Sequence, residues 1–143
     1  MLYTQYMDTA PHSKLALPPI SPAAPKPLYE QIVDGIKREI SAGRLAPHAP
    51  LPSFRALAED LLVSLITVKR AYEELERDGI IYRKQGLGTF VSEDGKERSR
   101  AVKHQHADAL LRQALREGIE AGLSPHELLS MARQILQEKE RAR

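Results

Sequence analysis

Hydroxyl and basic side chains gather in two short stretches of this sequence, and their chemistry suits the recognition of nucleic acid. Thr67, Lys69 and Arg70 follow one another closely, and Arg83 and Lys84 form a second basic group further along. Guanidinium and ammonium groups bind phosphate oxygens and guanine edges, and a hydroxyl can bond to either. The two stretches therefore predict contact with DNA, although an ordinary solvated helix surface is the alternative that charge alone leaves open.

Catalytic chemistry has no comparable basis in the sequence. The chain has no cysteine, which excludes disulfides, thiol catalysis and zinc-finger ligand sets. A two-residue step separates His104 from His106, so on a helix their side chains diverge and could not share a metal ion. The other histidines are His12, His48 and His126, and none forms a catalytic set with a carboxylate and a nucleophile. We therefore expect no catalytic residues, no metal, no cofactor and no enzyme activity.

Composition places the chain among globular proteins. Of its 143 residues, 42% are hydrophobic and 28% are charged, which suits one domain or a small domain with an accessory piece. The net charge of +2 permits DNA binding without indicating it, because phosphate contacts need positive charge on one face only. There is no apolar run of about 18 residues and no secretory signal at the start, so we expect a cytoplasmic protein without a membrane partner.

The chain divides into three predicted segments. Residues 1–26 contain five prolines and only three charged residues, which favours an irregular N-terminal arm. Residues 27–92 carry two hydrophobic periods in succession, first helical and then strand-like. Residues 93–143 begin with a charged stretch and become helical again.

Three helices and a hairpin are predicted within residues 27–92. The first helix has an apolar stripe at steps of four, from Leu28 to Ile40. Ser53 and Ser64 suit the N-caps of two shorter helices separated by only a tight turn, the second running over residues 65–78. Residues 80–83 and 89–91 then read as a hairpin around Gly86-Leu87-Gly88. The predicted fold is mainly α (α+β), a winged helix-turn-helix.

The third helix has two distinct sides. With about 100° between successive residues, Val68, Ala71, Tyr72 and Leu75 fall on the side that must face the core. In helix-turn-helix proteins the first residues of this helix reach base edges in the major groove, while a wing contacts phosphate or the minor groove. The predicted DNA-binding residues are Ser53, Arg55, Ser64, Leu65, Ile66, Thr67, Lys69, Arg70, Arg83, Lys84, Gln85, Gly86 and Gly88.

The last segment predicts two short helices that serve for dimerisation. Apolar residues recur between Ala107 and Ile119, and Ser124 with Glu127 forms the start signal of a final helix. Such a pair is too small for a core of its own and needs a partner surface. The residues predicted to form it are Leu110, Leu111, Leu115, Ile119, Leu128, Leu129, Ile135 and Leu136. A homodimer would place two recognition helices on a near-palindromic site, whereas folding back on the winged domain is the alternative.

Residues 27–91 resemble the N-terminal domain of GntR-family transcription regulators. The family pattern LPS-x-R-x-LA, VS-x-x-TV, AY-x-x-L and QG-x-GTFV is matched from Leu51 to Val91. The resemblance implies a DNA-binding regulator, a repressor, in which Arg55, Thr67 and Gly86 occupy DNA-contacting positions together with Lys69. The short two-helix tail resembles the YtrA subfamily, which implies that the tail is a dimerisation element.

Two residues depart from that family pattern. Members often carry arginine after the VS pair, where it reads guanine, and this chain has Leu65. They usually place glycine before that valine, where Leu62 stands. Leucine has no hydrogen-bond donors, so we expect a different operator, with Leu65 or Ile66 in apolar contact with thymine methyl groups.

Other functions remain open at this point. A winged-helix module for protein–protein assembly is the serious alternative, and its binding would not depend on salt. RNA binding is a weaker alternative, because the sequence pattern offers no exposed aromatic side chains on which bases could stack. A small effector is a further partner that the sequence neither requires nor excludes.

Overall fold

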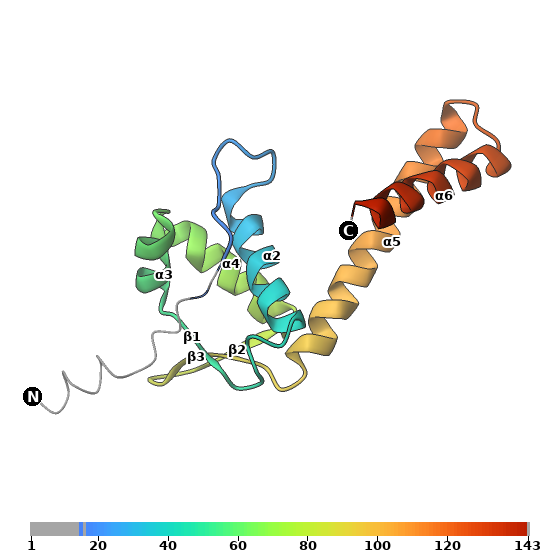
Figure 1. The fold of residues 1–143 in the computed structure, drawn as a ribbon. Helices are drawn as coiled ribbons and strands as arrows, with labels where there is room; N and C mark the ends of the chain where they lie inside the picture. The colour runs from blue at the N-terminus through green and yellow to red at the C-terminus, as the bar shows by residue number, and fades with distance from the viewer. Residues whose placement is uncertain (1–14, 16, 143) are drawn as a thin grey trace, which may run out of the picture. The chain divides into compact units, whose positions relative to one another are not determined.

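The computed structural model describes Leu15 and residues 17–142, so most of the predicted N-terminal arm lies outside the described residues. The chain forms two compact units, Met1–Val102 and Lys103–Arg143. Figure 1 shows the helices and strands of which each unit consists. The proposed division after residue 92 differs from this one, because the start of a long helix packs on the first unit.

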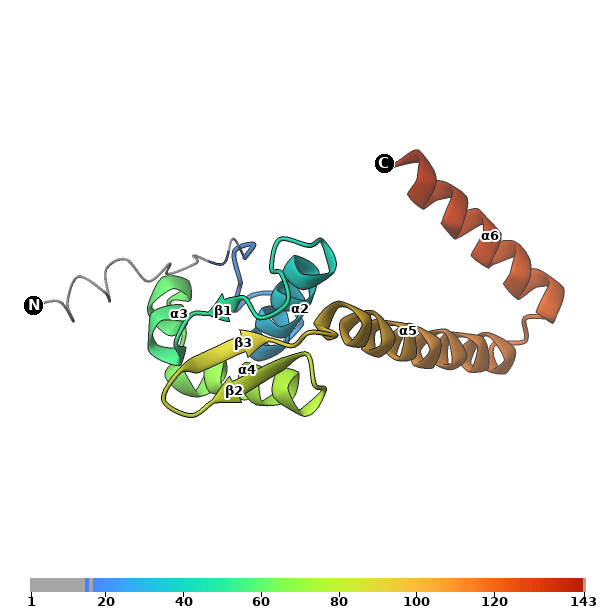
Figure 2. The same cartoon turned by 90° about the horizontal axis from the view of Figure 1, so that it is seen from below.

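The first unit contains the three predicted helices in the predicted order. They are α2 (Leu28–Ser41), α3 (Phe54–Leu61) and α4 (Leu65–Arg77). Helix α4 packs on both α2 and α3, as Figures 1 and 2 show. Ile32 and Ile36 of α2 are completely buried, so the predicted apolar stripe is the side that faces the core. The mainly helical winged fold is confirmed.

A three-stranded antiparallel sheet completes this unit. Its strands are β1 (Pro50–Leu51), β2 (Ile81–Lys84) and β3 (Gly88–Val91), in the spatial order β1-β3-β2. Ile81 pairs with Val91 and Lys84 with Gly88, which is the predicted hairpin. Strand β1, in which Leu51 pairs with Thr89, was not predicted from the sequence. Two residues are too few to produce an alternating pattern, so only the partner strand reveals this one.

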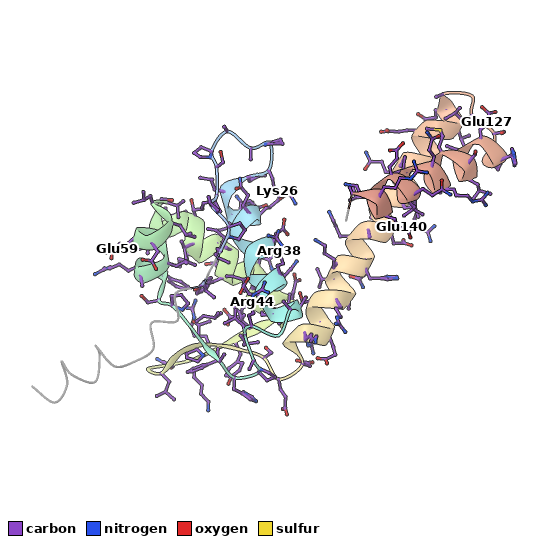
Figure 3. The ribbon with its side chains drawn as sticks, in the orientation of Figure 1. Lys26, Arg38, Arg44, Glu59, Glu127 and Glu140 are labelled. Atoms are coloured by element: carbon purple, nitrogen blue, oxygen red, sulfur yellow. The ribbon has the colours of Figure 1, made fainter. Side chains whose placement is uncertain are left out.

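An ion pair closes the turn after α2. The Glu39 carboxylate, almost entirely buried, accepts from Nε and Nη2 of Arg44, both at 2.8 Å. Arg44 is labelled in Figure 3. This hydrogen bonding holds the pKa of Glu39 below its usual value. A buried carboxylate is tolerated when it is paired in this two-point geometry.

The described residues before α2 form neither helix nor strand, but they are anchored. Leu17 lies against Gly35, where an added Cβ would come within 2.9 Å of its Cδ2. Lys26 Nζ is 2.6 Å from Asp34 Oδ2. This segment therefore covers part of the outer side of α2 by apolar contact.

Helix α5 (Gly95–Glu120) begins well before the position expected from the apolar pattern, which starts near Ala107. Gly95 and Ser99 are buried in the first unit, and the Oγ atoms of Ser99 and Ser41 lie 3.4 Å apart. A Cβ at Gly95 would lie 2.9 Å from the Ile80 carbonyl oxygen. The charged sequence of these turns concealed the helix, because only small residues face the core there.

Helix α6 (Pro125–Arg141) follows a short turn in the second unit. Ser124 Oγ accepts from the Glu127 amide at 3.1 Å, and the Glu127 carboxylate accepts from the Ser124 amide at 3.4 Å. This is the predicted capping box. The Leu128 side chain lies over Gly118, so α5 and α6 meet closely beside the turn.

Tyr72 provides a test of the core. Its side chain is completely buried, and its hydroxyl donates to the Pro52 carbonyl at 2.8 Å. Tyr72→Phe leaves that buried carbonyl without its partner, and we expect the free energy of unfolding to fall by roughly 1–3 kcal/mol. Urea denaturation followed by circular dichroism measures this difference.

Tyr82→Phe is the matched control. The Tyr82 hydroxyl hydrogen bonds at 2.9 Å to Nδ1 of the exposed His48, where water can replace the lost partner. We expect a change within about 0.5 kcal/mol. Equal losses for the two variants would contradict a special role for the buried bond.

Candidate nucleic-acid interface

The turn between α3 and α4 has a defined backbone. Leu62 caps α3 in the left-handed conformation, at φ 56° and ψ 46°. The Val63 amide donates to the Ala58 carbonyl at 3.0 Å, which satisfies one of the free carbonyls at the end of α3. A residue with a side chain costs roughly 1–2 kcal/mol more than glycine in this conformation. Leucine at position 62 therefore does not stabilise the backbone of the turn.

Serine hydroxyls start both helices of the motif. Ser53 Oγ accepts from the Ala56 amide at 3.1 Å, and Ser64 Oγ accepts from the Thr67 amide at 3.2 Å. The hydroxyls of Ser64 and Thr67 also bond to each other at 2.7 Å. These predicted site residues therefore fix the amino ends of α3 and α4. Their contact with DNA stays a prediction.

Helix α4 buries one side completely and exposes the other. Val68, Ala71, Tyr72 and Leu75 are each 0% exposed, as the helical wheel predicted. On the opposite side Lys69 is exposed, and two apolar residues precede it in the first turns, Leu65 and Ile66. A helix held this firmly by one side presents the other at a fixed rotation, which is what contact with base edges requires.

Arg70 is exposed, but its guanidinium is engaged within the molecule. Its Cζ lies 3.9 Å from the ring centroid of Tyr29 in α2, a cation–π geometry. The Tyr29 hydroxyl in turn donates to Glu30 at 3.1 Å. This hydrogen bond to a carboxylate raises the pKa of Tyr29. The sequence placed Arg70 and Lys69 together as DNA readers, whereas the structure gives them different surroundings.

The hairpin turn forms the second exposed basic group. Lys84, Gln85 and Gly86 are exposed at the end of β2, and Figures 1 and 2 show this turn extending on the side where α3 lies. Gly88 begins β3 at φ 122°, a value that side-chain-bearing residues rarely adopt. The turn is therefore an exposed wing that combines positive charge with accessible backbone.

Arg83 and Arg55 complete the predicted basic residues, and both are exposed. Arg83 Cζ lies 4.7 Å from the ring centroid of Phe54, the first residue of α3. Arg55 is the next residue of α3 and lies in its first turn. Through Phe54, the wing and the start of α3 are therefore in direct contact at this surface.

The second unit exposes most of the residues predicted for dimerisation. Helix α6 leads away from α5 after the turn (Figure 2), and only Leu128 among the predicted residues is half-buried. Sequence reasoning missed Met131, which is also exposed. The sequence could have indicated it, because Met131 lies between Leu129 and Ile135, two residues of α6 that were predicted for dimerisation. The predicted residues that stay exposed are Leu110, Leu111, Leu115, Ile119, Leu129, Ile135 and Leu136.

Neither a metal site nor a membrane span is found within the described residues. No group of three or more histidine, cysteine or carboxylate residues lies close enough to hold a metal ion there. In the same part of the chain, no helix has the length and apolar character needed to cross a membrane.

Comparison with known proteins identifies the family. The family model of bacterial regulatory proteins, gntR family, matches residues 28–91. The HTH-type transcriptional regulator YhcF of Bacillus subtilis is 36% identical over 109 residues, which are 73% of this chain and 85% of that protein. This chain belongs to the GntR family. The predicted family and fold class are confirmed, as is the prediction of a regulatory protein rather than an enzyme.

Two further GntR-type relatives support the comparison. The HTH-type transcriptional repressor YtrA of Bacillus subtilis is 43% identical over 77 residues, 54% of this chain and 59% of that protein. A solved structure of a GntR family transcriptional regulator from Listeria monocytogenes has a TM-score of 0.63 and 32% identity, over 80% of this chain and 98% of that chain. The likeness to YtrA confirms that resemblance. The match spans only 33% of the Bacillus subtilis repressor NagR.

Substitution of Arg70 and of its neighbour Lys69 tests whether the contact between Arg70 and Tyr29 stabilises the fold. We expect Arg70→Ala to lower the free energy of unfolding by about 0.5–1 kcal/mol, because the contact with Tyr29 is lost. Lys69→Ala should leave stability within about 0.5 kcal/mol. In a Tyr29→Leu background the Arg70 effect should disappear. Urea denaturation of the four variants measures the coupling, and an undiminished Arg70 effect in that background would exclude it.

Proposed function

We propose that this GntR-family protein binds a near-palindromic DNA operator as a homodimer and represses transcription in the cytoplasm. The observation that carries the proposal is the exposed side of α4, which presents Lys69 and is held by four completely buried residues on the other side of the helix. The wing adds Arg83, Lys84 and Gln85. This combination supplies both base-edge and phosphate contacts.

Homodimerisation is supported by the apolar surface of the second unit. Leu115 is 39% exposed and Leu136 is 66% exposed, in helices that separate after their turn. An exposed apolar surface of this kind is expected to be covered by a partner. A second copy satisfies this need with two-fold symmetry, and the same symmetry requires two similar half-sites in the DNA.

Repression is supported by the named activities of relatives. NagR and YtrA of Bacillus subtilis are HTH-type transcriptional repressors, and they are 41% identical over 80 residues and 43% identical over 77 residues to this chain. A dimer seated on an operator blocks access to the DNA that it covers. The winged-helix assembly module remains the competing function, and it is distinguished by its salt dependence.

Selection of bound sequences from random duplex DNA tests DNA binding. We expect a near-palindromic site whose affinity falls steeply with salt, since each phosphate contact releases a counterion. Lys69→Ala should reduce the slope of log affinity against log salt by about one per protomer if it contacts phosphate. Binding without enrichment, or with no dependence on salt, would favour the assembly module.

Leu115→Asp tests the dimer. A charge within the apolar surface should prevent burial of that surface against a second copy. We therefore expect a monomer by light scattering and much weaker operator binding. Gln113→Asp introduces the same charge on an exposed polar residue of α5 and should remain dimeric. A full-strength dimer in Leu115→Asp would contradict the assignment of this surface.

A further inference from the structure

Three apolar side chains stand exposed where α3 ends and α4 begins. Leu62 is 91% exposed, Ile66 is 77% exposed and Leu65 is 46% exposed. We call these three residues the leucine–isoleucine patch. Isolated apolar residues on a surface need no explanation, but three within five positions at the start of a recognition helix indicate a contact outside the molecule.

The side chain of Leu62 has no function in the fold itself. It is nearly fully exposed, and its backbone is left-handed, a conformation that glycine adopts more easily. Neither packing nor backbone geometry therefore favours leucine at this position. The presence of leucine is accounted for if the side chain contacts a group outside this chain.

Polar groups in the same turn are already engaged. The hydroxyls of Ser64 and Thr67 bond to each other at 2.7 Å, and Ser64 Oγ also accepts from the Thr67 amide. Lys69 is the first exposed cationic side chain of α4. The opening turn of the helix therefore presents mainly hydrocarbon to its partner.

In the major groove of DNA, the characteristic apolar group on a base edge is the C5 methyl of thymine. We infer that the leucine–isoleucine patch reads thymine methyl groups in each half-site, with Leu62 as a specificity-determining residue. The inference rests on the proposed DNA binding, because the patch is continuous with the exposed side of α4 assigned to the major groove. It goes beyond that function by naming the chemical group that is recognised.

Replacement of thymine by deoxyuridine tests the inference directly, because it removes the methyl group and leaves every hydrogen-bonding group in place. The operator obtained by selection is synthesised with single thymine-to-uracil changes, and affinity is measured by fluorescence anisotropy. We expect at least one position per half-site at which wild-type protein binds roughly threefold to fivefold more weakly without the methyl group.

Two variants should lose this discrimination. Leu62→Gly and Ile66→Ala should bind thymine and uracil operators with nearly equal affinity at the affected positions. Leu62→Gly also provides its own folding control, because its thermal unfolding midpoint should be unchanged or higher once the left-handed strain is relieved. Leu87→Ala, an apolar residue 70% exposed on the wing, should keep the full difference between the two operators.

A methylated cytosine supplies an independent gain of binding. Where a sensitive thymine–adenine pair is replaced by cytosine–guanine, 5-methylcytosine should bind more tightly than cytosine, and only when the patch is intact.

The outcomes separate the two proposals. A salt-dependent, enriched operator with no uracil-sensitive position would overturn the reading of methyl groups and leave the proposed function standing. Unchanged discrimination in Leu62→Gly and Ile66→Ala would also overturn it, and the patch would then be available to a protein partner. Absence of any enriched operator would overturn the proposed function itself.

Discussion

Burial of one side of α4 is the constraint on which the rest of the structure depends. Tyr72 lies at the centre of it, completely buried, with its hydroxyl on the Pro52 carbonyl and its ring edge-on to Phe54. These contacts tie α4 to the start of α3 and to the residues just after β1. Because packing fixes that side, α4 presents Leu65, Ile66 and Lys69 on its exposed side in one orientation.

The wing is connected to the same centre. Phe54 contacts both the ring of Tyr72 and the guanidinium of Arg83. A basic side chain of the hairpin is thus held by an aromatic ring that also belongs to the helix-turn-helix motif. The two halves of the interface are coupled through packing, which reduces the side-chain freedom lost when DNA is bound.

The sequence predicted the helices with a strong apolar period or a clear cap. It did not predict the elements that form only through contact with residues distant in the sequence. The stripe of α2 and the serine caps of α3, α4 and α6 are local signals, and each proved reliable. Strand β1 and the first turns of α5 depend on a distant partner, so their own residues carried no pattern. The engagement of Arg70 with Tyr29 was hidden for the same reason, since a helical wheel shows only one helix. Leu62 departs from the family pattern in the sequence, but its left-handed backbone and near-full exposure are visible only in the structure.

The segment before α2 is part of the folded first unit. The family match begins at residue 28, yet Leu15, Leu17 and Ile20 pack against the core from before that point. Gly35 is buried because Leu17 lies over it. A shortened chain beginning at residue 27 would therefore leave an apolar strip along α2 open to water. A protein expressed from the family boundary would therefore be more prone to self-association through this strip, which would be mistaken for the proposed dimer.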